Sequence, residues 1–212
     1  MKKFIKVLLE ILGAVFLLAL IGGGFLLLYK GGGEKVQNTV KSNSGVRVIT
    51  EQMGFYYKDN LISGQVYRPI DKDSTYRVPA VVYCQSVEYG QEWCRELAAC
   101  GFVAYAFNFT SDDAKLRQNE LKEVMKQISN LRYVKPNKVF LLGEGNGCRT
   151  ACEFTFDNPK KLAGLMLLSP GFNPLEMSRK AKRYNGQILV VDEAHLGHDK
   201  CVQEIAEHVS KR

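Results

Sequence analysis

Short, continuously apolar runs alternate with amphipathic segments through most of the chain. The runs have the length of strands that are buried on both faces, and they lie at 80–84, 102–107, 138–142 (apolar after Lys138), 165–168 and 188–191. Apolar residues recur at helical spacing between or after these runs, at 93–100, 121–131, 148–155 and 201–209. This alternation predicts an α/β fold, with a mostly parallel central sheet that helices cover on both faces.

The segment before the first of these runs has a different pattern. Residues 46–67 hold β-rich stretches on either side of Lys58-Asp59-Asn60, which is a typical turn sequence. We therefore expect an N-terminal antiparallel hairpin at the edge of the parallel sheet.

The N-terminus predicts a membrane anchor. Ile11 to Tyr29 is a run of 19 residues without a charge, and as a helix it would span about 28 Å. A cleaved signal peptide would have a shorter apolar region and a small-x-small cleavage site, which is not found here. We expect one transmembrane helix over 1–30, a flexible tether over 31–45 and a globular domain over 46–212. The short basic tail before the run favours a cytoplasmic N-terminus and an extracytoplasmic domain.

The positive charge of the chain does not indicate nucleic-acid binding. The sequence has 29 Lys and Arg residues against 22 Asp and Glu residues. Residues 1–35 alone hold five lysines against two glutamates, and the remaining excess is scattered without a basic, aromatic-rich stripe. Nucleic acid is therefore excluded as the expected partner.

The turn after the run at 138–142 carries the most informative motif. Leu142-Gly143-Glu144-Gly145-Asn146-Gly147-Cys148 places glycine at three alternate positions between a strand and a helix. Here the chain resembles the α/β-hydrolase family, whose nucleophile elbow reads Gly-x-Ser-x-Gly in this place. The resemblance extends in order and spacing over 62–69, 79–82, 93–101, 138–143 and 165–170, which together cover most of 46–192.

The resemblance implies an elbow without its nucleophile. Gly145 occupies the place of the family's serine and brings no hydroxyl, so the covalent acyl-enzyme route is closed there. Gln85-Ser86 stands where the family has His-Gly near the oxyanion hole. The backbone N–H groups of Val87 and Asn146 remain candidate donors into a pocket.

The other two triad positions are also altered. The family's acid position falls at Asp192 or Glu193, but its histidine follows one more strand, and only a helical segment follows Val191 here. His195 lies in the acid loop instead. The nucleophile and the histidine of the triad are therefore both missing from their expected places.

Two groups of residues are candidates to replace the missing triad members. Cys148, in the first turn of the helix after the elbow, is the fallback nucleophile, although that position ordinarily faces the sheet. Metal ligands would have to come from one polar cluster, which comprises Asp192, Glu193, His195, His198 and Asp199. Gly197 favours a solvated loop in that place, and we predict neither a metal nor a cofactor.

The sequence therefore predicts a membrane-anchored, α/β-hydrolase-like domain that is catalytically inactive and serves as a binding or scaffolding module. A small molecule or a protein is the expected ligand. The candidate binding residues are Gln85, Ser86, Val87, Glu144, Gly145, Asn146, Asp192 and His195. The alternative is an active hydrolase of esters or other acyl compounds that uses a non-standard nucleophile.

Overall fold

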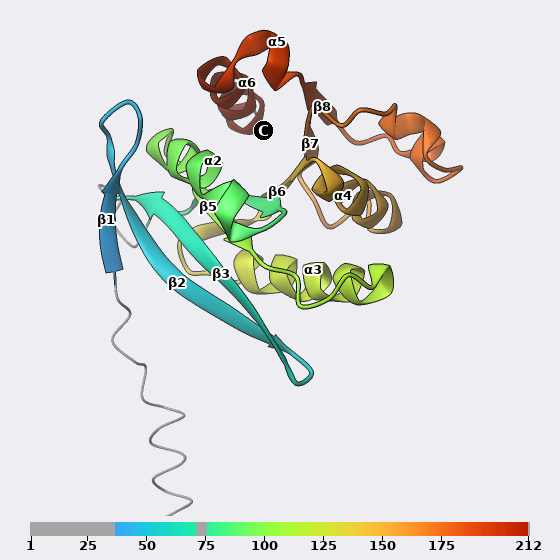
Figure 1. The fold of residues 1–212 in the computed structure, drawn as a ribbon, viewed down its shortest axis with the longest axis horizontal. Helices are drawn as coiled ribbons and strands as arrows, with labels where there is room; N and C mark the ends of the chain where they lie inside the picture. Colours follow the sequence, from blue (N-terminus) through green and yellow to red (C-terminus); the bar gives the residue numbers. More distant parts are fainter. Residues whose placement is uncertain (1–36, 71–75, 212) are drawn as a thin grey trace, which may run out of the picture. The chain divides into compact units, whose positions relative to one another are not determined.

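A computed structural model describes residues 37–70 and 76–211. Strands and helices alternate along most of this range (Figure 1). The strands are β1 Gln37–Lys41, β2 Arg47–Tyr57, β3 Asn60–Pro69, β4 Val78–Cys84, β5 Val103–Phe107, β6 Val134–Glu144, β7 Gly164–Leu168 and β8 Ile188–Val191. The α-helices are α2 Val87–Ala99, α3 Ala114–Ser129, α4 Asn146–Asp157, α5 Glu193–Leu196 and α6 His198–Ser210, with short 3-10 helices at Pro174–Glu176 and Ala181–Arg183.

All eight strands form one sheet in the order β1-β2-β3-β5-β4-β6-β7-β8. The five strands from β5 to β8 in this order pair in parallel, whereas β1, β2 and β3 pair antiparallel and β3 joins the others antiparallel to β5. The predicted α/β fold with a mostly parallel sheet is confirmed. β6, which leads into the predicted elbow, lies in the middle of the parallel part.

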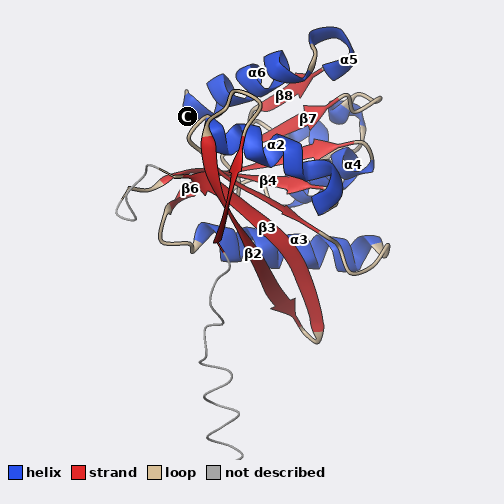
Figure 2. Cartoon of the chain, turned by 60° about the vertical axis from the view of Figure 1, so that its left-hand side comes forward, coloured by secondary structure: helices blue, strands red, loops and turns tan. Residues whose placement is uncertain are grey.

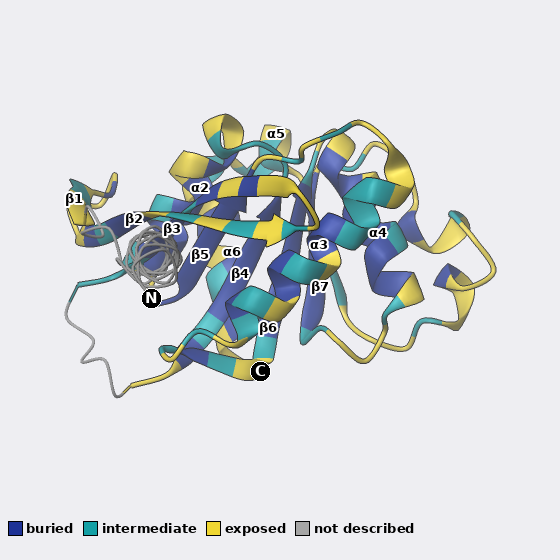
Figure 3. Ribbon diagram, turned by 90° about the horizontal axis from the view of Figure 1, so that it is seen from below, coloured by how far each residue is buried: buried dark blue, intermediate teal, exposed yellow. Residues whose placement is uncertain are grey.

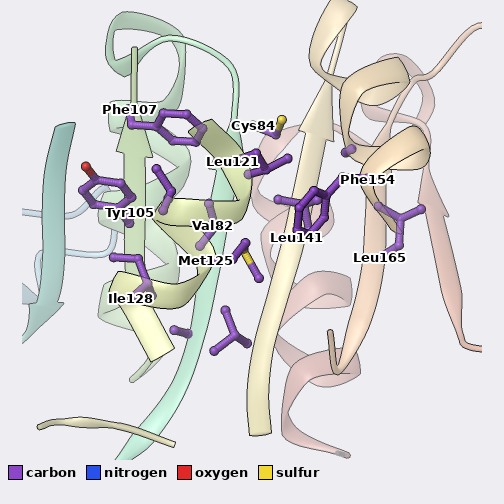
Figure 4. Packing of buried hydrophobic residues seen from close by; sticks show 14 of the residues in the cluster. Val82, Cys84, Tyr105, Phe107, Leu121, Met125, Ile128, Leu141, Phe154 and Leu165 are labelled. Carbon is purple, nitrogen blue, oxygen red and sulfur yellow. The ribbon is translucent and has the colours of Figure 1, made fainter. Parts of the chain in front are cut away.

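Helices cover both faces of the sheet because every central strand is apolar on both sides. Along β6, Leu141 faces α3 and α4, whereas Phe140 and Leu142 face α2 and α6. Figure 2 shows α3 on one side of the sheet and α2 and α6 on the other, and Figure 3 shows the central strands buried between these layers. The core on the α3 side includes Tyr105, Phe107 and Leu121 (Figure 4).

The predicted hairpin is present as β2 and β3. Tyr57 pairs with Asn60, so Lys58 and Asp59 alone form the turn, and Lys58 has a φ of 54°. The positive φ at the first turn residue matches the twist of the flanking strands.

The predicted tether over 31–45 needs correction. Residues Gln37–Lys41 form strand β1, which pairs with Arg47–Glu51 of β2. The sequence did not indicate this strand because Val40 is its only apolar residue, and its place in the sheet depends on backbone pairing with β2. The predicted anchor over 1–30 and residues 31–36 lie outside the described residues. Over residues 37–70 and 76–211, no helix combines the length and the apolar character that crossing a membrane requires.

The segment after β8 is more helical than expected. The predicted acid loop contains the short helix α5, and His198 is the first residue of α6. Gly197 separates the two helices with a φ of 78°, a value that favours glycine.

Candidate functional site: the elbow between β6 and α4

The chain turns sharply between β6 and α4. Gly145 is the only residue between these elements, and it has a φ of 50° and a ψ of −125°. These angles lie in a region that residues with side chains adopt only under strain. The elbow geometry is therefore present at the centre of the sheet, where the family resemblance places it.

The outer glycines of the elbow are required by close packing. A Cβ at Gly147 would lie 1.7 Å from the carbonyl oxygen of Cys84, and a Cβ at Gly143 would lie 2.8 Å from the Cα of Cys148. A Cβ at Gly145 would instead have the Gln85 side-chain oxygen, at 3.4 Å, as its nearest neighbour. Gly145 therefore has room for a side chain, and only its backbone angles favour glycine.

A cavity of about 270 Å³ lies beside the elbow, and we call it the elbow pocket. It forms at the carboxyl ends of β4 and β5 and at the first turn of α4, the end of a parallel sheet where ligands usually bind. Its lining residues are Cys84, Gln85, Ser86, Tyr89, Asn108, Phe109, Arg117, Asn146, Gly147 and Thr150. Three of the predicted binding residues, Gln85, Ser86 and Asn146, are among them.

One predicted backbone donor is already engaged. The Val87 N–H donates to the side-chain oxygen of Asn108, at 3.0 Å, so it does not point into the elbow pocket as we expected. The Asn146 N–H is at the first position of α4, where no carbonyl of its own helix can accept it. The side-chain oxygens of Gln85 and Ser86 are buried and have no hydrogen-bond partner within the described part of the chain.

Among the described residues that line the elbow pocket, Arg117 alone is charged. It projects from α3, and its Nε donates to the Ser111 carbonyl at 2.9 Å. Its guanidinium also pairs with Asp112, whose side chain is 99% exposed, and lies over the Phe109 ring. Neither Arg117 nor Asn108 was among the predicted site residues. Asn108 directly follows the carboxyl end of β5, which is the signal that could have found it, whereas Arg117 reaches the pocket from α3 and no local pattern indicates it.

Cys148 does not face the elbow pocket. Its side chain is fully buried, and the thiol donates to the Leu168 carbonyl on β7, at 3.5 Å. Burial is the main cause that raises the pKa of this thiol to about 12. Such a thiol is neutral at pH 7 and out of reach of a ligand.

Glu144 belongs to a different environment from the one we expected. It accepts a hydrogen bond from the Tyr83 hydroxyl, and Tyr83 lies in the core between the sheet and helices α2 and α6. Desolvation raises the pKa of Glu144, and the nearby Glu193 raises it further. Glu144 is not among the described residues that line the elbow pocket.

His198 and Glu193 lie near Glu144. The Nδ1 of His198 is 3.4 Å from a Glu193 carboxylate oxygen, and its ring packs on Trp93 with centroids 4.1 Å apart. This grouping depends on α6 packing against α2, which no local sequence pattern indicates.

Asp192 and His195 form a separate, exposed pair. The Nδ1 of His195 lies 2.5 Å from Asp192, and this hydrogen bond is the main cause that lowers the pKa of Asp192. Asp192 also lies 3.4 Å from the Ser169 hydroxyl, so the carboxylate stands between the serine and the histidine. Neither Asp192 nor His195 lines the elbow pocket.

No group of three or more His, Cys, Asp or Glu side chains in the described ranges is placed to hold a metal ion. His195 and His198 each contact one carboxylate, and these are different carboxylates. The polar cluster at 192–199 is therefore divided between the exposed pair and the group around Glu144.

Comparison with solved structures identifies the fold. An esterase from Thermogutta terrifontis matches with a TM-score of 0.58 and 13% identity, over 76% of this chain and 94% of that one. A dienelactone hydrolase-like promiscuous phosphotriesterase from metagenomic libraries matches with a TM-score of 0.58 and 18% identity, over 77% of each chain. The chain spans only 39% of a third match, a candidate dipeptidyl aminopeptidase IV of Bacteroides ovatus, which has a TM-score of 0.55 and 11% identity over 84% of this chain.

No family model and no curated protein matches the sequence. These three structures are each less than 25% identical to this chain, and they establish the fold alone. The resemblance to α/β-hydrolases is confirmed at that level: the chain has a hydrolase-like fold.

Proposed function

We propose that this chain is a non-catalytic α/β-hydrolase-fold protein that binds a small anionic ligand in the elbow pocket and is held at a membrane by residues 1–30. The observation that carries the proposal is Gly145. It keeps the backbone angles of a nucleophile elbow, and it has no side chain with which to attack a substrate.

The surroundings of the elbow support the absence of covalent catalysis. Cys148 is buried against β7, and its thiol is neutral at physiological pH. None of the described residues that line the elbow pocket is a histidine, the usual general base for an acyl transfer.

The lining of the elbow pocket favours an anion. Its one charged side chain, Arg117, is cationic, and its partner Asp112 is fully exposed to water, which weakens that pair. The N–H of Asn146 lies at the N-terminus of the 12-residue helix α4, where the helix dipole favours negative charge. A cavity of about 270 Å³ accommodates only a small molecule.

Catalysis is tested with the purified full chain in detergent. We expect no turnover of p-nitrophenyl acetate above the rate of buffer, and no labelling by a fluorophosphonate probe. The competing hypothesis is an ester or acyl hydrolase with a non-standard nucleophile. Turnover that a Cys148→Ala or Ser169→Ala variant abolishes would establish that hypothesis and overturn ours.

Binding is tested by titrating the same preparation with benzoate and, as a neutral molecule of matching shape, with benzamide. Benzoate should shift the amide NMR signals of Asn146 and Gly147, and benzamide should not. An Arg117→Gln variant should bind benzoate about tenfold more weakly, whereas Arg117→Lys, which keeps the charge, should retain most of the binding. Equal binding of both compounds, or of neither, would contradict an anion site.

Membrane anchoring is supported by the 19 uncharged residues from Ile11 to Tyr29. We propose a single span with the domain on the extracytoplasmic side. The protein should stay in the membrane fraction after alkaline carbonate extraction, and a protease added to spheroplasts should digest the domain. Release of the protein by carbonate would contradict the membrane anchor. Protection of the domain from protease would show that the domain lies on the cytoplasmic side.

A further inference from the structure

A second cavity lies far along the strands from the elbow pocket. It has a volume of about 770 Å³, within the usual range of ligand sites. It runs between α3, the end of β2, the start of β6 and the segment before β7. The site lies at the start of β6, whereas the elbow lies at the opposite end of that strand, so this site and the elbow pocket are separate. Figure 1 shows α3 beside the β2–β3 hairpin, which borders the site.

Lysines dominate the charge of this cavity, which we call the lysine groove. Lys122 and Lys126 come from successive turns of α3, and Lys160 and Lys161 come from the segment before β7. Glu123 is the one acidic residue in the lining. The groove therefore carries four positive charges against one negative charge.

The single carboxylate is already neutralised. Glu123 lies 3.4 Å from the Lys126 ammonium and accepts a hydrogen bond from Gln127 at 2.5 Å. Lys122, Lys160 and Lys161 are exposed, and none of them has an acidic partner in the described part of the chain. Three unpaired ammonium groups thus surround one space.

The rest of the lining is partly apolar. Tyr57, Met125 and Leu162 contribute carbon surface. The Tyr57 ring also has the Lys58 ammonium over it, 5.6 Å from the ring centroid. Lysine ammonium groups bind phosphates as point charges. Tyrosine is suited to the boundary between water and lipid. The ligand that fits has a negative headgroup and an apolar body.

We propose that the lysine groove binds the phosphate headgroup of an anionic phospholipid and so holds the domain on the membrane surface. The negative surface of an anionic lipid membrane attracts clusters of Lys and Arg residues, and the attraction falls off within a Debye length. The groove shares no lining residue with the elbow pocket, so the two ligand proposals can fail independently.

The proposal is tested by lysine footprinting on the full chain in zwitterionic micelles. Dihexanoyl phosphatidylglycerol, which is soluble, is added, and the acetylation of each lysine is measured by mass spectrometry. We expect at least about threefold protection of Lys122, Lys160 and Lys161, and loss of that protection between about 50 mM and about 500 mM NaCl. Dihexanoyl phosphatidylcholine, which has no net charge, should protect none of them.

The matched controls make the result decisive. A Lys122→Gln/Lys160→Gln/Lys161→Gln variant should lose phosphatidylglycerol binding, measured by calorimetry. A Lys182→Gln/Arg183→Gln/Lys200→Gln variant, with the same change in charge elsewhere, should keep phosphatidylglycerol binding.

Equal loss of phosphatidylglycerol binding in both variants would show a nonspecific charge effect. Equal protection by inorganic phosphate would show a free-phosphate site. Absence of protection would show no site, and each of these three outcomes overturns the proposal.

Discussion

The backbone at Gly147 lies so close to the Cys84 carbonyl oxygen that a Cβ at position 147 would stand 1.7 Å from it. This contact joins the first turn of α4 to the end of β4, and it fixes how the elbow approaches the neighbouring strand. The elbow therefore constrains position 147 through backbone packing and position 145 through backbone angles alone.

The first prediction compares these two glycines. Gly147→Ala forces α4 or β4 to move and should reduce the free energy of unfolding by about 3 kcal/mol or more. Gly145→Ala meets no close neighbour and should lose only about 1–2 kcal/mol, from its positive φ. Urea denaturation measures both variants. Similar losses of unfolding free energy in the two variants would show that the contact with the Cys84 carbonyl does not limit position 147.

The second prediction concerns restoring the nucleophile. Gly145→Ser adds a hydroxyl at the elbow, but the elbow pocket has no histidine in its lining to accept the proton. We expect no measurable turnover of p-nitrophenyl acetate, together with a loss of about 1–3 kcal/mol in stability. Turnover in this variant that a His195→Ala or His198→Ala change removes would show that a histidine reaches the elbow after all.

The third prediction concerns the cysteines, all six of which are free. Cys100 is exposed at the end of α2, whereas Cys84 and Cys148 are fully buried, with pKa values that burial raises. Iodoacetamide at pH 7.5 should modify Cys100 in the folded protein and the buried cysteines only after unfolding. Peptide mass spectrometry checks this order, and a Cys100→Ser variant should resist modification. Early modification of Cys148 would contradict the structure.

The fourth prediction is a pH dependence from Glu144. Its raised pKa means that the folded state binds this proton more tightly than the unfolded state. The contribution of Glu144 to stability therefore falls as pH rises from the ordinary pKa of a glutamate through the raised one. Glu144→Gln can still accept from Tyr83 and should be more stable than the natural protein at pH 7, with less difference at pH 4.

Urea denaturation across that pH range measures the effect. Glu176→Gln, on an exposed segment away from the elbow, is the control and should leave the pH profile unchanged. A Glu144→Gln profile that runs parallel to that of the natural protein would show that the carboxyl group is not desolvated in solution.

The parallel half of the sheet could be predicted from the sequence because burial on both faces leaves a local signature. Runs such as 139–142 and 165–168 are apolar at every position and lie within strands of the structure. Strand β1 left no such signature, because four of its five residues are polar and its stability comes from pairing with β2. The start of α3 was also missed, because its first turns, from Ala114 to Asn119, carry few apolar residues.

The elbow could be located for a similar reason, since three alternate glycines after a buried strand are a local pattern. The surroundings of the elbow could not be predicted, because they depend on side-chain direction. Glu144 and Asn146 flank the same glycine, yet the first turns toward Tyr83 and the second lines the elbow pocket. Arg117 reaches that pocket from a helix about 30 residues earlier in the sequence, and no spacing rule connects the two.

Strand β8 gives the sheet an open border in the described part of the chain. It pairs with β7 alone, all four of its residues are apolar, and Val190 is 50% exposed. The outward N–H and C=O groups of such a strand are hydrogen-bonded to water and form a template for another extended peptide. Concentrated preparations should therefore associate strand to strand along β8, unless a further segment of polypeptide covers it.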